Sequence, residues 1–195
     1  MNKPFLIISA LLLLTLNACS ALGIATGAAA TAGVAVAKEG GLRESLTDAK
    51  IATLIRDKWF RYNVDTFTKL NLSINQGRVL VTGAVQDPQH RVEAIRLIWE
   101  VKDVKQVINE VQVADGEGIK GFARDAWIST RLRTQMTFNK EVQSINYSIE
   151  TVHAVVYLMG VGQDQAELNR VIEIARTIPH VRQVVSYVKL AGAKS

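Results

Sequence analysis

The chain repeats itself at a fixed offset of 77 residues. Residues 48–113 and 125–190 align without a gap, and 14 of the 66 aligned pairs are identical. Residues 78–83 read RVLVTG and their counterparts 155–160 read VVYLMG, so each copy contains a β-branched and aromatic stretch that reaches a glycine. A copy of this length can bury one modest core. The repeat therefore predicts two small domains of like fold.

Hydrophobic periodicity predicts the order α-β-β-α-β in each copy. Ile51, Ile55 and Trp59 recur every four residues, as on the buried face of a helix. The first copy is predicted to form elements at residues 47–60, 70–74, 79–81, 88–101 and 107–113. The second copy is predicted to form them at residues 124–138, 145–151, 155–159, 165–178 and 181–190. The fold class is α+β, with two tandem α-β-β-α-β domains, each a three-stranded mixed sheet packed by two helices.

Three local features of the repeat carry further expectations. Each central strand is expected to stop at its glycine, Gly83 or Gly160, where backbone freedom permits a bulge or a sharp bend. The dipeptide Gln76-Gly77 predicts a tight hairpin turn in the first copy. The second copy has His153-Ala154 at this place, so its turn is expected to be looser or of another type.

The N-terminus has the features of a bacterial lipoprotein signal. Met1-Asn2-Lys3 forms a short positive segment, residues 5–16 are apolar but too few to span a bilayer, and Leu16-Asn17-Ala18-Cys19 resembles a lipobox. The resemblance implies cleavage before Cys19, diacylglycerol attachment and N-acylation (palmitate), with Ser20 matching lipoproteins sent to the outer membrane. The alternative is an ordinary secretory signal with an incidental cysteine. The expected plan is signal peptide 1–18, Ala/Gly-rich tether 19–45, first domain 46–113, linker 114–121 and second domain 122–191.

Charge and chemistry narrow the function classes. The formal charge of +5 favours anionic partners, either lipid headgroups or nucleic acid, and the lipoprotein signal favours lipid and argues against nucleic acid. His90, His153 and His180 are scattered without metal-ligand or catalytic spacing, and Cys19 is the sole cysteine. We therefore expect no catalytic residue, no metal and no cofactor, in a protein that is not an enzyme.

The first helix of the second copy shows an unusual outward face. Ile128, Leu132 and Met136 form its buried stripe, whereas Trp127 lies about 140° from the centre of that stripe. Arg124, Arg131, Thr134 and Phe138 fall beside Trp127 within about 80° of arc. Aromatic rings rimmed by arginines suit the boundary of an anionic bilayer. Two alternatives stay open: Trp127 packs against the other domain or the linker, or it binds a protein partner. Trp99, on the second helix of the first copy, is expected to extend the core or contact the second domain.

The motifs together resemble a known family. They are the strand with its glycine, the helix begun by Asp87 or Asp164, the closing runs Val104-Lys105-Gln106-Val107 and Val181-Arg182-Gln183-Val184, the lipobox, the linker, and Asp125-x-Trp127-Ile128-x-Thr130-x-x-Arg133. This set is similar to the dual BON-domain outer-membrane lipoproteins of the DolP (YraP) type.

That resemblance implies a function and a site. The first helix of the second domain would bind anionic phospholipid, with Trp127 inserted and Arg131 and Arg133 in the basic pattern. It further implies a role in envelope integrity, enrichment at the division site, and outer-membrane assembly or cell-wall remodelling proteins as partners. A periplasmic adaptor or chaperone-like module that binds an envelope protein is the alternative.

Overall fold

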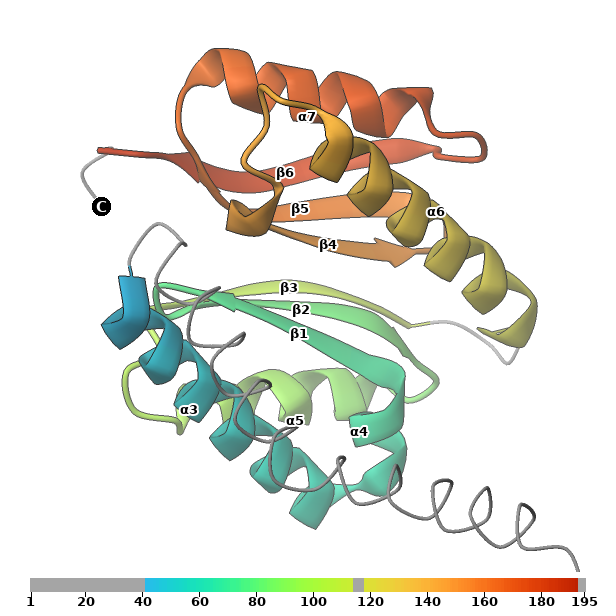
Figure 1. Ribbon diagram of the computed structural model, residues 1–195. Helices are drawn as coiled ribbons and strands as arrows, with labels where there is room; N and C mark the ends of the chain where they lie inside the picture. Colours follow the sequence, from blue (N-terminus) through green and yellow to red (C-terminus); the bar gives the residue numbers. More distant parts are fainter. Residues whose placement is uncertain (1–40, 114–117, 193–195) are drawn as a thin grey trace, which may run out of the picture. The chain divides into compact units, whose positions relative to one another are not determined.

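The computed structural model describes residues 41–113 and 118–192, which belong to one compact unit; for residues 65–67 and 118–120 it describes the backbone alone. The expected signal peptide, Cys19 and the tether up to residue 40 lie outside the described residues, as do linker residues 114–117. The described residues form two tandem domains of the predicted α+β class, each with helices on one face of a three-stranded sheet (Figure 1).

Domain 1 adds one short helix to the predicted order. Its elements are α3 (Gly41–Tyr62), α4 (Val64–Lys69), β1 (Leu70–Asn75), β2 (Arg78–Val85), α5 (Pro88–Trp99) and β3 (Gln106–Val113). The central strand β2 pairs antiparallel with β1 and parallel with β3, which gives the expected mixed sheet. Helix α3 begins at Gly41 and so takes in the last residues of the predicted tether. The six residues of α4 are too few to reveal a period in the sequence.

Domain 2 repeats this arrangement. Its elements are α6 (Gly118–Phe138), the 3-10 turn η1 (Ser144–Asn146), β4 (Tyr147–Val152), β5 (Val155–Gly162), α7 (Gln165–Thr177) and β6 (Gln183–Leu190). Strand β5 is central, antiparallel to β4 and parallel to β6. Helix α6 begins at Gly118, inside the predicted linker. Asp164 accepts a hydrogen bond from the Glu167 backbone N–H at 2.8 Å, which caps α7 as its spacing predicts.

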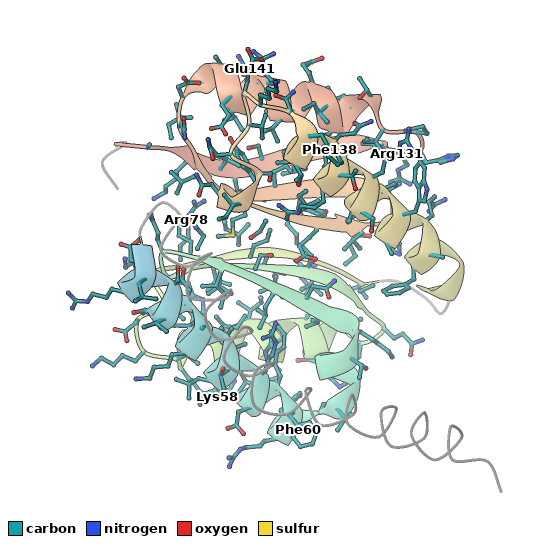
Figure 2. The ribbon with its side chains drawn as sticks, in the orientation of Figure 1. Lys58, Phe60, Arg78, Arg131, Phe138 and Glu141 are labelled. Atoms are coloured by element: carbon teal, nitrogen blue, oxygen red, sulfur yellow. The ribbon has the colours of Figure 1, made fainter. Side chains whose placement is uncertain are left out.

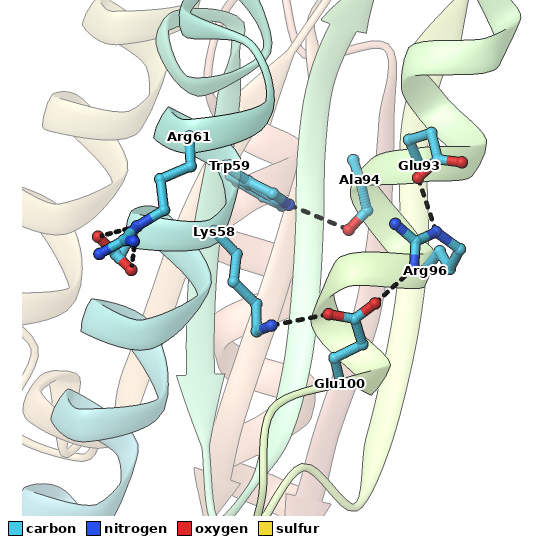
Figure 3. Close-up of polar contacts among 8 residues, drawn as sticks. Lys58, Trp59, Arg61, Glu93, Ala94, Arg96 and Glu100 are labelled. Atoms are coloured by element: carbon cyan, nitrogen blue, oxygen red, sulfur yellow. Dashed lines mark hydrogen bonds and ion pairs between the residues drawn. The ribbon is translucent and has the colours of Figure 1, made fainter.

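The predicted helix stripes form the two cores. Ile51, Ile55 and Trp59 are buried under α3, and Ile128, Leu132 and Met136 are fully buried under α6. Trp59 also ties two helices together, because its indole Nε1 donates to the Ala94 carbonyl on α5 at 3.0 Å (Figure 3). Each domain therefore has a core of its own between helices and sheet.

At Gly83 and Gly160 the central strand stops pairing with its antiparallel neighbour but does not end. The antiparallel pairing stops at Gly83, opposite Leu70, and at Gly160, opposite Tyr147. Both central strands nevertheless run two residues further against their parallel neighbours, so the expectation that they stop there is wrong. At Gly160 φ is +142°, and an added Cβ would lie 1.9 Å from the Asn146 carbonyl oxygen. Glycine is required there because the backbone at the end of η1, just before β4, lies so close.

The two hairpin turns share one backbone class. Gln76 and Gly77 have φ of 56° and 77°, and His153 and Ala154 have φ of 49° and 64°. The expected looser second turn is therefore wrong. Its physical reason is Asp125 on α6, whose carboxylate accepts the His153 and Ala154 backbone N–H groups at 2.7 and 2.9 Å. These charge-assisted bonds offset the strain of a left-handed alanine.

The sheets of the two domains pack on each other through a third core. Leu80 and Ile108 of domain 1 contact four residues of domain 2, namely Val152, Val155, Tyr157 and Met159. Polar groups close the same interface: the Arg78 guanidinium donates to the Tyr187 carbonyl at 2.7 Å (Figure 2). In each sheet one face therefore meets its own helices and the other meets the opposite sheet.

Candidate functional site

The outward face of α6 presents two aromatic rings and an arginine. The side chain of Trp127 is 43% exposed and that of Phe138 is 82% exposed. The Arg131 guanidinium carbon lies 5.5 Å from the centroid of the indole ring, which is a cation–π contact. Arg131 and Phe138 both project from α6 in Figure 2. We call Trp127, Arg131 and Phe138 the aromatic face.

A residue from another element completes the surroundings of the indole. His180 follows α7, and its ring centroid lies 6.2 Å from that of Trp127 with an interplanar angle of 66°. Both ring contacts of Trp127 among the described residues are thus within domain 2. These two contacts do not support the alternative in which Trp127 packs against domain 1, and linker residues 114–117 lie outside the described residues.

The charged residues of α6 are mostly basic. Its charged residues are Lys120, Arg124, Asp125, Arg131 and Arg133. The sole carboxylate, Asp125, is nearly buried and holds the hairpin turn. Arg131 has no ion-pair partner among the residues that the structure describes, so its charge is available to a ligand.

Two other residues of the predicted site, Arg124 and Thr134, lie beside the aromatic face. The Arg124 side chain is half exposed, with Nε 4.0 Å from the Asp125 carboxylate. The Thr134 hydroxyl donates to the Thr130 carbonyl at 2.9 Å, so its hydrogen bond is made within α6. Both lie on the exposed side of α6, beside the aromatic face.

Arg133 is engaged inside the domain. It lies about 120° around the helix from Trp127. One guanidinium nitrogen donates to the carbonyls of Ser144 and Tyr147, both at 2.8 Å. Burial lowers the pKa of Arg133, while the Glu150 carboxylate acts in the opposite direction. These contacts make Arg133 a support for the start of β4, and we leave it out of the site.

Trp99 offers an instructive comparison on domain 1. It is 54% exposed, so the expectation that it extends the core is wrong. Arg96, three residues before it on α5, bonds to both Glu93 and Glu100, and Lys58 of α3 reaches Glu100 at 2.7 Å (Figure 3). An exposed tryptophan thus occurs in both domains, but the one on α6 lies beside Arg131, which has no ion pair within residues 41–113 and 118–192.

Comparison with known proteins assigns the fold to a family. The BON domain pattern matches residues 47–115 and 124–192. The chain belongs to the BON family. It is 40% identical over 150 residues to an Anaplasma centrale protein described as "Uncharacterized protein in gshII 5'region", covering 76% of this chain and 98% of that one.

Two further relatives have more informative names. Over 121 residues the chain is 26% identical to outer membrane lipoprotein DolP of Haemophilus influenzae, covering 62% of each chain. Over 124 residues it is 26% identical to osmotically-inducible protein Y of Escherichia coli, covering 63% of this chain and 62% of that one. The match thus spans about three fifths of each of these two relatives.

The residues of the BON motif in domain 2 divide into those that stabilise the domain and one that is exposed to solvent. In the motif that begins at Asp125, the aspartate holds the hairpin, Ile128 fills the core and Arg133 binds backbone carbonyls. Trp127 alone in that set shows a large apolar ring to solvent. In BON domain 1 the counterpart of Trp127 is Lys50, so the aromatic face belongs to BON domain 2.

Two exposed residues on or near α6 were not predicted from the sequence as part of the site. Phe122 is 74% exposed in the first turns of α6, but its helix was predicted to begin at residue 124. His180 is 53 positions from Trp127, and no local pattern connects them.

In the described part of the BON tandem, no helix is both long and apolar enough to cross a bilayer. Across that same part, no three His, Cys, Asp or Glu residues are arranged to hold a metal ion.

Proposed function

We propose that this chain is a lipid-anchored outer-membrane protein, facing the periplasm, that binds anionic phospholipid through the aromatic face of BON domain 2. The observation that carries the proposal is the half-exposed indole of Trp127 in cation–π contact with Arg131. The name of the lipoprotein relative supports the envelope assignment. Attachment through Cys19 and a role in envelope integrity, with enrichment at the division site, are parts of the same proposal.

The face suits a bilayer boundary in length and chemistry. Trp127 and Phe138 are eleven residues apart, which places them about 16 Å apart along α6. Both rings can enter the headgroup region while Arg131 donates to phosphate oxygens. Ring burial contributes on the order of a few kcal/mol and each basic contact about 1 kcal/mol. Binding of this strength is reversible and adds a second signal to an acyl anchor.

The test compares two tryptophans of similar exposure. Protein lacking residues 1–19 is mixed with phosphatidylglycerol or phosphatidylcholine vesicles at several salt concentrations, and cosedimentation is measured. Trp127→Glu is expected to lose binding to phosphatidylglycerol, because it replaces the ring with a charge that anionic lipid repels. Trp99→Glu, on BON domain 1, is the matched control and is expected to bind normally. Equal binding to both lipids, or equal effects of both substitutions, would refute the proposal.

The anchor and the location need separate measurements. Mass spectrometry of the N-terminal peptide is expected to show acyl mass at Cys19, and Cys19→Ala is expected to release the protein from the membrane fraction. A fluorescent fusion is expected to concentrate at the division site, and the Trp127→Glu fusion to spread evenly. A membrane-bound fusion whose distribution ignores Trp127 would point instead to an adaptor that binds an envelope protein.

A further inference from the structure

His180 occupies a backbone position that the fold holds in a special conformation. Its φ is +72°, and its counterpart in the repeat, Asp103, has the same φ of +72°. Both residues lie between the second helix and the last strand of their domain. Histidine and aspartate are among the few residues other than glycine that adopt this left-handed region readily. The fold thus presents one residue at this place in each domain.

The residue at this position and the first-helix residue matched to Trp127 are charged in domain 1 and aromatic in domain 2. The first-helix counterpart of Trp127 is Lys50, so domain 1 supplies Lys50 and Asp103 where domain 2 supplies Trp127 and His180. Domain 2 therefore has a ring in place of each charged side chain. One of these rings is an imidazole, which carries a positive charge when protonated.

We propose that His180 is a ligand-contacting residue of the anionic lipid site, so that the site is built from two elements and gains a cation at acid pH. This inference rests on the proposed function and names a residue and a pH dependence that α6 does not supply. The imidazole and the Arg131 guanidinium both lie about one ring contact from the indole, so a headgroup that binds at Trp127 would lie close to both. Histidine is the side chain that changes charge between about pH 5 and 8.

The charged groups around His180 favour this role. Arg131 contacts the same indole as His180, and Arg176 and Arg182 are the cations nearest His180 along the chain, with Glu173 paired to Arg176 at 2.9 Å. The carboxylate of α6, Asp125, binds the hairpin turn. A protonated imidazole would thus join a basic surface, which an anionic bilayer stabilises because its own potential attracts both the protein and protons.

The test is the pH profile of vesicle binding. Phosphatidylglycerol vesicles suit it because the phosphodiester keeps its charge between about pH 5.5 and 8. The wild-type protein is expected to bind about fivefold more tightly at the lower pH, as one added basic contact implies. His180→Asn, a neutral residue that tolerates positive φ, is expected to remove this difference. His180→Asp, which restores the domain 1 residue, is expected to bind more weakly than His180→Asn at both values.

A second histidine provides a matched control. His90 on α5 also meets an aromatic ring edge-on, that of Tyr62, at a centroid distance of 6.2 Å. His90→Asn is therefore expected to keep the full pH difference. A His180→Asn protein that binds vesicles with the wild-type pH profile would overturn the inference while leaving the proposed function intact. If the wild-type protein binds no vesicles at any pH, the proposed function fails, and the inference fails with it.

The contact itself has a readout that needs no lipid. The indole N–H resonance of Trp127 is expected to shift with pH in the wild-type protein and to stay constant in His180→Asn. A resonance that titrates identically in both proteins would show that another group controls the environment of the indole, and would also overturn the inference.

Discussion

The hydroxyl of Ser73 donates a hydrogen bond to the carboxylate of Glu150 at 2.9 Å, and these two residues are the same position of the two repeats. A second contact has the same property, because the Tyr187 hydroxyl bonds to the carboxylate of its counterpart Glu110. Residues that meet their own counterparts lie on a twofold relation between the sheets. The tandem thus forms internally the kind of isologous interface that a symmetric homodimer forms between chains.

The stability of this interface is expected to depend on the ionisation of Glu150. Burial raises its pKa, against the opposing effects of the Ser73 hydrogen bond and the Arg133 charge. A carboxyl group whose pKa is higher in the folded protein binds more protons there than in the unfolded chain. Its contribution to the free energy of unfolding therefore falls as the pH rises from the unfolded pKa, about 4.3, through the folded value.

Glu150→Gln tests this dependence. Glutamine does not ionise, so the variant should lack the loss of stability that Glu150 causes as the pH rises. The free energy of unfolding of the variant relative to that of the wild type should therefore increase between about pH 4 and 7. Urea denaturation of both proteins across this range measures the difference. A difference that does not change with pH would contradict the prediction.

The core between the sheets should couple the two domains. Leu80 is fully buried against domain 2, so Leu80→Ala should lower the free energy of unfolding by about 2–5 kcal/mol. Amide hydrogen exchange should become faster in β5 as well as in β2, because Tyr157 and Met159 lose a packing partner. Unchanged protection in β5 would show that the sheets do not support each other.

The hairpin clamp should matter most where the turn lacks glycine. Asp48 accepts the Gln76 and Gly77 backbone N–H groups as Asp125 accepts those of its own turn. Replacing Asp48 by alanine should cost about 3 kcal/mol, since two hydrogen bonds to a charged group are lost, and replacing Asp125 should cost more. Without the clamp, the left-handed Ala154 is strained whereas Gly77 is not.

Exchange rates of the turn amides separate the two cases. Asp125→Ala should expose the His153 and Ala154 amides and change the conformation of their turn. Asp48→Ala should leave the Gln76-Gly77 turn in its present form. Equal loss of the two turns would mean that the glycine contributes nothing to the first.

Arg131 and Arg133 should behave oppositely although they are two residues apart. Arg131→Ala should weaken binding to phosphatidylglycerol vesicles about fivefold, with stability unchanged within about 0.5 kcal/mol. Arg133→Ala should lose two hydrogen bonds to carbonyls and about 2 kcal/mol of stability, with lipid affinity unchanged. Vesicle binding and urea denaturation of both variants check this. A loss of affinity in folded Arg133→Ala would return this residue to the site.

The sequence by itself determined the features that depend on near neighbours. The offset of the repeat, the class and order of the main elements, and the buried stripes under α3 and α6 all follow from periodicity along the chain. The outward position of Trp127 follows in the same way, since the angle between residues on one helix is set by its geometry. The unpredicted α4 and the early starts of α3 and α6 show where the local signal was too weak.

Tertiary structure alone decided the relations between residues far apart in the chain. It brought Asp125 to a turn 28 residues away, Arg133 to two carbonyls at the start of β4, and His180 into ring contact with Trp127. It also set Ser73 against Glu150, and it left Trp99 in solvent. Each of these depends on how the elements pack, and periodicity within one element does not specify which distant backbone group its polar side chains will reach.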